Sequence, residues 1–185
     1  MSGMLSEGTG SIRGYKFLVK KMKFPVSTIP TFVSLSKLYA HLAGVSVILA
    51  VFWAFGYPPD IYILQLPLYI LCMFVFFTIL SLFTSIISAM SKDFGKLMNS
   101  LVSAAFWLSG VIYDVNTVKI PWLKKALMFN PITFICNGYR NCFVYKIWFF
   151  EQSKRFGYFI IVTVIMFILA ILAYRKFRKE IPDVL

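Results

Sequence analysis

The sequence predicts an all-α membrane protein, because of its composition and its long apolar segments. Of its 185 residues, 59% are hydrophobic and only 14% are charged, and the mean hydropathy is +0.79. A soluble domain of this size cannot bury so much apolar surface. We expect a single membrane domain over residues 1–185 with four transmembrane helices, a short re-entrant helical pair between the third and the fourth, and an N-terminal amphipathic cytoplasmic segment.

Residues 1–35 are expected to form this basic cytoplasmic segment, in which Lys and Arg outnumber the single acidic residue, Glu7. Ile12, Tyr15, Val19 and Met22 recur at spacings of three and four residues. This periodicity predicts a short amphipathic helix that lies on the membrane surface with its lysines toward lipid headgroups.

Four segments are expected to span the membrane: residues 36–56, 64–90, 97–113 and 157–174. A helix needs about 20 apolar residues to cross a hydrocarbon core of ~30 Å. The second segment exceeds this length and must tilt or bend near Pro67, whereas the third is at the lower limit. A turn separates the first two segments, and residues 91–96 are expected to form a polar loop.

Residues 114–156 resist assignment as a span. The apolar run over residues 126–139 is short and is interrupted by Asn130 and Pro131. Such a run must dip into the membrane and return, or lie in the interface. We therefore expect an external re-entrant region here.

Charge predicts the orientation. Basic residues occur in the N-terminal segment, in the 91–96 loop and in the C-terminal tail, whereas the turn between the first two expected spans has none. The positive-inside rule therefore places both termini in the cytoplasm. The 175–185 tail is then cytoplasmic. The external region nevertheless carries seven Lys and Arg residues. Either the span count is wrong by one, or these cations meet an anionic substrate or headgroup. Agreement between the termini and the loop favours the second explanation.

The motifs that are missing disfavour an enzyme. The sequence has no G-x-x-x-x-G-K-[ST], no H-E-x-x-H and no G-x-S-x-G followed by a triad His, so we expect neither a nucleotide site nor catalysis in this chain. Few carboxylates lie within the spans, which argues against ion-driven transport and points to energy from a partner. The net charge of +12 is concentrated beside the spans, where it fits anionic lipid better than nucleic acid.

Other polar and aromatic residues leave alternatives open. Cys136 and Cys142 either pair or remain free thiols, and no metal-ligand spacing occurs. His41 and Lys37 lie one turn apart; they either relay protons or serve the structure, with His41 hydrogen-bonded inside the bundle. Aromatic residues near the third span either line a path for sugars or lipid chains or face the surrounding lipid.

Two motifs in this order are similar to those of a known family: K-K-x-K-F-P (Lys20 to Pro25), and the N-P-x-x-x-x-x-x-x-Y-R run from Asn130 to Arg140. The chain resembles the permease subunit of type-two ABC exporters, with the wall teichoic acid translocation permeases of Gram-positive bacteria most similar and the O-antigen and capsular polysaccharide export permeases as relatives. Such permeases usually have six spans. The resemblance covers nearly all of this chain but only the C-terminal two thirds, roughly, of the family's length, which suggests a fragment, a mis-started reading frame or one half of a split permease.

The resemblance implies a cell-membrane permease that exports a lipid-linked anionic glycopolymer, like wall teichoic acid attached to undecaprenyl lipid. Energy would come from a P-loop ATP-binding subunit, with ATP and Mg bound there and no cofactor in this chain. A permease homodimer would assemble with two such subunits into a heterotetramer. Alternatives are export of a neutral polysaccharide or O-antigen, export of drugs or small lipids, or an inactive structural membrane fragment.

The resemblance also assigns candidate sites. The coupling helix that docks on the ATP-binding subunit would include Glu7, Gly8, Thr9, Gly10, Ser11, Arg13 and Lys16, with a second contact from Lys92 to Lys96. The re-entrant pair would cover residues 123–140. Its exit gate would comprise Asn130, Pro131, Tyr139 and Arg140. The substrate pathway would involve Phe106, Trp107, Tyr113, Lys124 and Lys125.

Overall fold

The computed structural model describes residues 1–21 and 25–185, and in this part of the chain all regular secondary structure is helical. Met22, Lys23 and Phe24 of the K-K-x-K-F-P motif lie outside the described residues. The elements are α1 (Ser2–Gly14), α2 (Lys16–Lys21), α3 (Thr28–Ala54), η1 (Ile61–Gln65), α4 (Leu66–Met90), α5 (Lys92–Leu108), η2 (Val115–Thr117), α6 (Pro121–Met128), α7 (Pro131–Arg140), η3 (Asn141–Tyr145), η4 (Phe149–Gln152), α8 (Ser153–Phe177) and α9 (Ile181–Val184). The η elements are 3-10 helices except η3, which is a π-helical turn.

Three segments of the described residues are long and apolar enough to cross a membrane: Thr28–Ala54, Ile61–Met90 and Phe149–Phe177. They correspond to the expected spans at 36–56, 64–90 and 157–174, and each extends further toward the N-terminus than expected. The first begins early because Pro30 lies in the first turn of α3, where its missing N–H costs no hydrogen bond within the helix.

The third expected span, 97–113, has different bounds in the structure. Helix α5 covers 17 residues, or about 26 Å at 1.5 Å per residue, and it falls outside the three candidate spans. It begins early because the Ser91 side chain caps it, accepting a hydrogen bond from Phe94 N at 3.4 Å. The expected polar loop over residues 91–96 is therefore wrong: α4 and α5 are joined through Ser91 alone.

The N-terminal segment also differs from the expected surface helix. It forms two helices that meet at Tyr15, and α1 packs inside the bundle against α3, α4 and α5. Its buried residues include the small side chains Gly8, Thr9 and Ser11. Such residues allow two helix backbones to approach closely, and this close approach is why α1 is buried despite its weak hydrophobic pattern.

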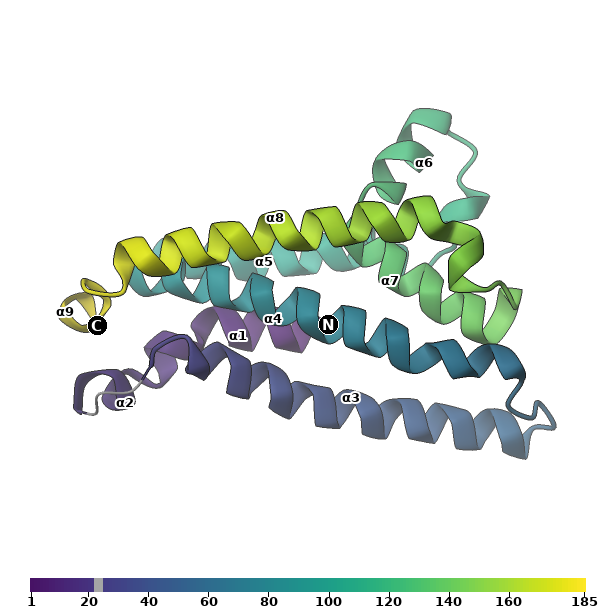
Figure 1. The fold of residues 1–185 in the computed structure, drawn as a ribbon, viewed down its shortest axis with the longest axis horizontal. Coiled ribbons are helices and arrows are strands. Elements are labelled where there is room, and N and C mark those ends of the chain that lie inside the picture. The colour runs from purple at the N-terminus through teal and green to yellow at the C-terminus, as the bar shows by residue number, and fades with distance from the viewer. Residues whose placement is uncertain (22–24) are drawn as a thin grey trace.

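The long helices lie along one axis, with α3 and α5 running one way and α4 and α8 running back (Figure 1). Helices α2 and α9 and the start of α5 lie at the same end, which we call the basic end. Its exposed cations include Lys16, Lys20, Lys21, Lys92, Lys96, Arg175, Lys176, Arg178 and Lys179. The opposite end carries η1, α6, α7 and η4, and we call it the hairpin end.

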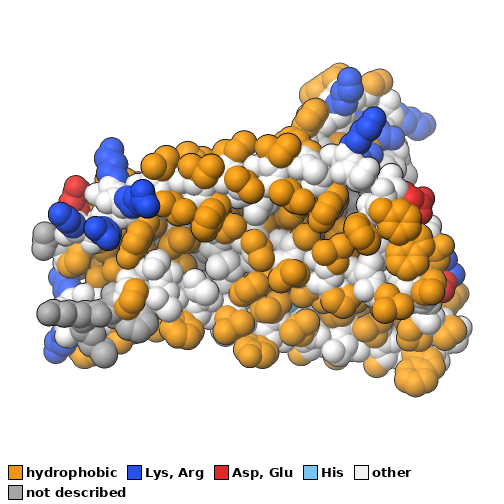
Figure 2. Space-filling model, in the orientation of Figure 1, with side chains coloured by type: hydrophobic (Ala, Val, Ile, Leu, Met, Phe, Trp, Pro, Cys, Tyr) orange, Lys and Arg blue, Asp and Glu red, His pale blue; other side chains and the backbone are white. Residues whose placement is uncertain are grey.

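The surface between the two ends is largely apolar on the face shown in Figure 2. Exposed apolar residues of α3 and α8 include Val47, Ile48, Ile161 and Val164. Inside, one cluster of buried residues includes Met73, Phe76, Phe77, Ile135 and Phe159. A second cluster, which includes Ile12, Ile86 and Ile181, holds α1, α4 and α9 together. This multi-pass arrangement fits a lipid environment.

Two short helices occupy the expected re-entrant region. Helices α6 and α7 contain 8 and 10 residues, too few to cross a bilayer. Asn130 begins α7, and its side chain accepts a hydrogen bond from Ile132 N at 3.0 Å. Gly138 packs directly on the ring of Tyr69 in α4. The helical pair is present, and its insertion into a membrane stays a prediction.

Gly8 and Gly10 provide a matched test of the packing of α1. A Cβ on Gly8 would collide with Ser81 of α4, whereas a Cβ on Gly10 would meet nothing within 4 Å. We expect Gly8→Ala to lower the stability of the bundle by about 1–3 kcal/mol through overpacking. Gly10→Ala should be neutral or raise it by about 0.5–1 kcal/mol, because Ala favours helix.

The measurement is the thermal unfolding midpoint of the purified chain in detergent, for both variants and the unmodified protein. Equal midpoints for the two variants would show that the close contact between Gly8 and Ser81 does not stabilise the bundle.

Candidate functional site

A polar seam joins α1 to α4 near the basic end. Thr9 Oγ1 lies 2.9 Å from Thr84 Oγ1 in a hydrogen bond, and Ser81 Oγ donates to Met4 O at 2.9 Å. Both contacts are buried, so water does not compete for them. The seam therefore fixes α1 in one register along α4.

Arg13 completes this seam at the C-terminus of α4. Its Nε donates to Ser88 O at 2.5 Å and its Nη2 donates to Ala89 O at 2.9 Å. Carbonyls in the last turn of a helix lack partners within the helix and carry partial negative charge, so a guanidinium is favourable there. Arg13 thus ties the end of α1 to the junction between α4 and α5.

The structure separates the seven residues expected to couple to an ATP-binding subunit. Gly8, Thr9 and Ser11 are buried within this chain, and Arg13 is turned onto α4. Glu7 forms an ion pair with Lys37 of α3 at 2.5 Å. Gly10 and Lys16 are exposed.

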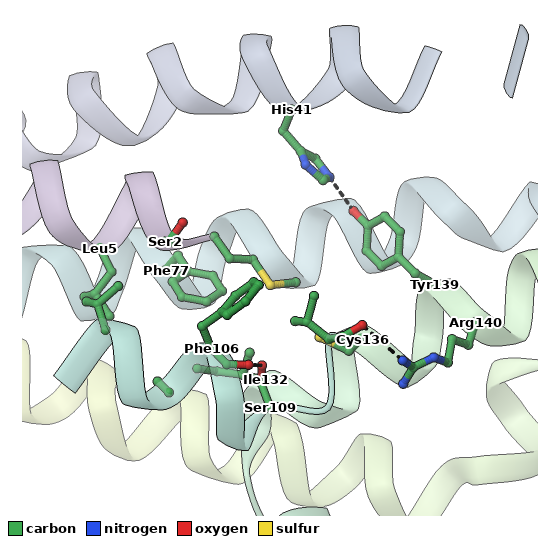
Figure 3. Close-up of a pocket in the computed structure, with 14 residues that line it drawn as sticks. Ser2, Leu5, His41, Phe77, Phe106, Ser109, Ile132, Cys136, Tyr139 and Arg140 are labelled. Atoms are coloured by element: carbon green, nitrogen blue, oxygen red, sulfur yellow. Dashed lines mark hydrogen bonds between the residues drawn. The ribbon is translucent and has the colours of Figure 1, made fainter. Parts of the chain in front are cut away.

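A cavity of about 430 Å³ lies between α1, α3, α4, α5 and α7. Figure 3 shows Leu5, Phe77, Phe106 and Ile132 among the apolar side chains that line it, with the polar side chains of His41, Ser109, Tyr139 and Arg140. Apolar walls with a few convergent polar groups are typical of sites for small molecules or for part of a larger ligand.

A hydrogen bond of 2.7 Å between His41 Nε2 and Tyr139 Oη joins α3 to α7 beside this cavity (Figure 3). The hydrogen bond that the structural interpretation of His41 expects inside the bundle is present, while Lys37 pairs with Glu7. Cys136 also lines the cavity, and it is a free thiol, as are Cys72 and Cys142.

The expected gate residues divide between two roles. Tyr139 and Arg140 line the cavity, and Arg140 Nη2 donates to Val111 O at 3.2 Å, which ties α7 to the segment after α5. Asn130 and Pro131 instead form the turn that begins α7.

The expected pathway residues are not brought together. Phe106 lines the central cavity, whereas Trp107 is 65% exposed on α5. Tyr113 lies beyond the end of α5, which corrects its expected place on the third span. Lys124 and Lys125 belong to α6, where Lys124 Nζ donates to Asn116 O at 2.8 Å.

Several charges at the hairpin end are already paired. Lys146 Nζ lies 2.8 Å from Asp60 Oδ2, and this contact lowers the pKa of Asp60 and raises the pKa of Lys146. Burial opposes ionisation of Asp114, but hydrogen bonds from Tyr145 and Asn116 more than offset it, so its pKa is lowered. Arg155 Nη2 contacts Met128 Sδ at 3.3 Å. The side chains that make these contacts at the hairpin end are thus less available to an anion than a count of Lys and Arg suggests.

Three buried amides at the hairpin end have no place among the expected site residues. Gln65, 4% exposed, donates to Ile147 O at 2.8 Å and accepts from Phe149 N at 2.9 Å, so it clamps the segment that leads into α8. Asn137 and Asn141 are buried around the end of α7. A spacing of four places both on one helix face. Two amides at this spacing in an apolar segment could have identified them as candidate site residues from the sequence.

Comparison with known proteins identifies the family. Residues 1–144 match the family described as "ABC-2 type transporter". The chain is also similar to the "O-antigen export system permease protein RfbA" of Myxococcus xanthus, with 21% identity over 137 residues. That similarity covers 74% of this chain and 53% of the relative, so the chain spans about half the length of this curated relative. Because the family match covers well over half of the chain, the protein belongs to the ABC-2 type transporter family.

Proposed function

We propose that this chain is a membrane permease subunit of an ATP-driven exporter that moves a lipid-linked polysaccharide across the cytoplasmic membrane. The family match over residues 1–144 carries the proposal. It is supported by the similarity to a protein named as an O-antigen export permease, and by a cavity between membrane helices with largely apolar walls.

Membership of this family implies a partner subunit that binds ATP. We propose that the partner docks at the basic end, where Lys16 of α2 and Lys92 at the start of α5 are exposed. The seam between α1 and α4 supports this choice, because Arg13 holds the chain beside α2 against the last turn of α4. A displacement of α2 would then reach the bundle core through buried contacts. ATP and Mg would bind on the partner, and two copies of each subunit would form the working exporter.

We further propose that the basic end faces the cytoplasm, together with the C-terminus; Met1 lies instead in the wall of the central cavity, midway along the bundle. Clusters of Lys and Arg beside apolar spans set this orientation, and the exposed cations of α2 and the C-terminal tail lie at the same end (Figure 1). The hairpin end then faces outward and meets the polymer as it leaves.

The exported polymer is either anionic or neutral. The number of Lys and Arg residues at the hairpin end is typical of a site for an anionic polymer such as a teichoic acid. The contacts that several of these side chains already make within the protein are more consistent with a neutral polysaccharide. Lys146 is bound to Asp60, and Lys124 and Arg140 donate to backbone carbonyls. The carboxylate of Asp60 offsets the charge of Lys146, whereas the carbonyls hold the side chains of Lys124 and Arg140 in place and occupy one donor of each. Screening in physiological salt limits attraction beyond ~8 Å. The pairing favours the neutral cargo.

The decisive experiment is reconstitution. The chain would be co-expressed with candidate P-loop ATPases, purified in mild detergent, and reconstituted into vesicles that contain a lipid-linked polysaccharide. We expect a stable complex and movement of the polymer that requires ATP. Failure to recover any ATPase, together with no ATP-dependent movement, would exclude the proposed function.

Charge reversal tests the docking surface. Lys16→Glu should lower the recovery of the ATPase several-fold in co-purification, because Lys16 is exposed at the basic end. Lys154→Glu, an equal charge change at the exposed start of α8, is the matched control and should leave the recovery unchanged. Equal recovery for both variants would exclude Lys16 from the docking surface.

Charge removal on α6 tests the cargo. If the polymer is anionic, replacing Lys124 and Lys125 by Gln should reduce export several-fold at low salt and less at high salt, because the contribution is electrostatic. We expect the export rate of the double variant to equal that of the unmodified protein, as a neutral polymer requires. A salt-dependent loss would identify an anionic cargo instead.

A further inference from the structure

A second, polar cavity lies at the hairpin end, apart from the central one. It has a volume of about 880 Å³ and is bounded by η2, α7, η3, η4 and the start of α8. We call it the outer cavity. Its lining is rich in planar polar groups, among them Asp114, Asn116, Asn137, Asn141, Glu151 and Gln152. Such side chains offer donors and acceptors in pairs at fixed angles.

One of the lining amides has unmet hydrogen-bonding capacity. Asn137 is 6% exposed, and its Oδ1 has no hydrogen-bond partner among the described residues. A buried polar atom without a partner costs about 1–3 kcal/mol, so this acceptor in the wall of a cavity calls for an explanation. A small reorientation of the Asn137 amide would let a ligand hydroxyl group donate to this oxygen. Asn141, 2% exposed, lines the same cavity.

The charges around the outer cavity balance. Lys154 and Arg155 are offset by Asp114 and Glu151, so an anion gains no net attraction from these four side chains. Tyr145 donates a hydrogen bond to Asp114, and Glu151 accepts one from Trp148 N at 3.2 Å. The carboxylates are thus engaged within the protein. A neutral ligand with many hydroxyl groups suits this lining better than a phosphate or a cation.

An apolar cavity of about 290 Å³ adjoins the outer cavity, and the two share Asn137, Gln152, Lys154 and Arg155 in their walls. Phe129 and Tyr158 line its apolar side, with their rings edge to face at 5.4 Å between centroids. Sugars present hydroxyl groups at their edges and C–H groups on their faces. Polar amides beside an aromatic pair match both kinds of surface.

We propose that the outer cavity binds a neutral saccharide unit of the exported polymer, with Asn137 and Asn141 hydrogen-bonding its hydroxyl groups and the Phe129–Tyr158 pair packing on its face. This inference rests on the proposed export function. It assigns the hairpin end a sugar-binding role that is distinct from the apolar central cavity.

Substitution of Asn137 separates this role from a structural one. Asn137→Leu keeps the approximate volume and removes an amide whose Oδ1 is unpaired inside the chain, so the thermal unfolding midpoint should stay constant or rise. Saccharide binding should nevertheless weaken about tenfold. Gln152→Ala, at a half-buried position in the walls of both cavities, should weaken it about threefold. The matched control is Asn99→Leu, the same substitution at an exposed position of α5, and it should not alter binding.

Binding would be measured on the full chain in lipid nanodiscs by saturation-transfer difference NMR. The probes are oligosaccharides of the host's surface polysaccharide, freed from lipid by mild acid, and inorganic phosphate as a competitor. We expect the oligosaccharides to bind the unmodified chain and phosphate to leave that binding unchanged. No binding to the unmodified chain, equal binding by Asn137→Leu, or displacement by phosphate would each overturn the inference.

These outcomes are separate from those of the reconstitution experiment. ATP-dependent export by a protein that fails the binding test leaves the export function standing and removes the sugar site. Saccharide binding by a protein that forms no ATPase complex retains the site and removes the export function.

Discussion

The fold depends on the close packing of α1 against α4. Gly8 lies directly on Ser81, Thr9 and Thr84 share a buried hydrogen bond, and Arg13 binds the last carbonyls of α4. In a lipid environment helices gain little from hydrophobic association, so short polar side chains and close backbone contact are the main means of holding them together. Helix α4 also contacts α3, α5, α7 and α8, which makes the seam the point where the N-terminal segment joins the whole bundle.

The sequence predicts the long helices well and the short ones poorly, for physical reasons. Runs of about 20 apolar residues have few alternatives to a helix, and α3, α4 and α8 follow from them. Burial of α1 could not be predicted in this way, because it depends on small residues of α4 more than 70 positions away. The start of α5 is indicated in the sequence by one local signal, the capping residue Ser91 followed by Asp93. Because these residues are polar, polarity alone predicts a loop there.

The candidate site shows the same division. The turn at Asn130 and Pro131 follows from local chemistry, since Asn caps helices and Pro suits the first helical position. Contacts between residues far apart in the sequence cannot be predicted from local chemistry. Examples are the hydrogen bond of His41 with Tyr139, the ion pair of Lys146 with Asp60, and the hydrogen bonds of Gln65 with the backbone on either side of Trp148. The number of Lys and Arg residues over 114–156 suggested an anionic ligand, and only the three-dimensional contacts show which of these side chains are already engaged.

The single-residue connection at Ser91 has a mechanical consequence. With no slack between α4 and α5, the two helices cannot slide apart where they meet. At its other end α5 leads into the long segment over residues 109–120, which contains only the short η2. That segment is held to α7 by the hydrogen bond from Arg140 to Val111 O, and α5 itself is joined to α1 by the hydrogen bond between Ser6 and Asn99. Helix α5 is therefore fixed at both ends and along its length. Val102, Phe106 and Ser109 form one wall of the central cavity, so the width of that cavity depends on these three attachments.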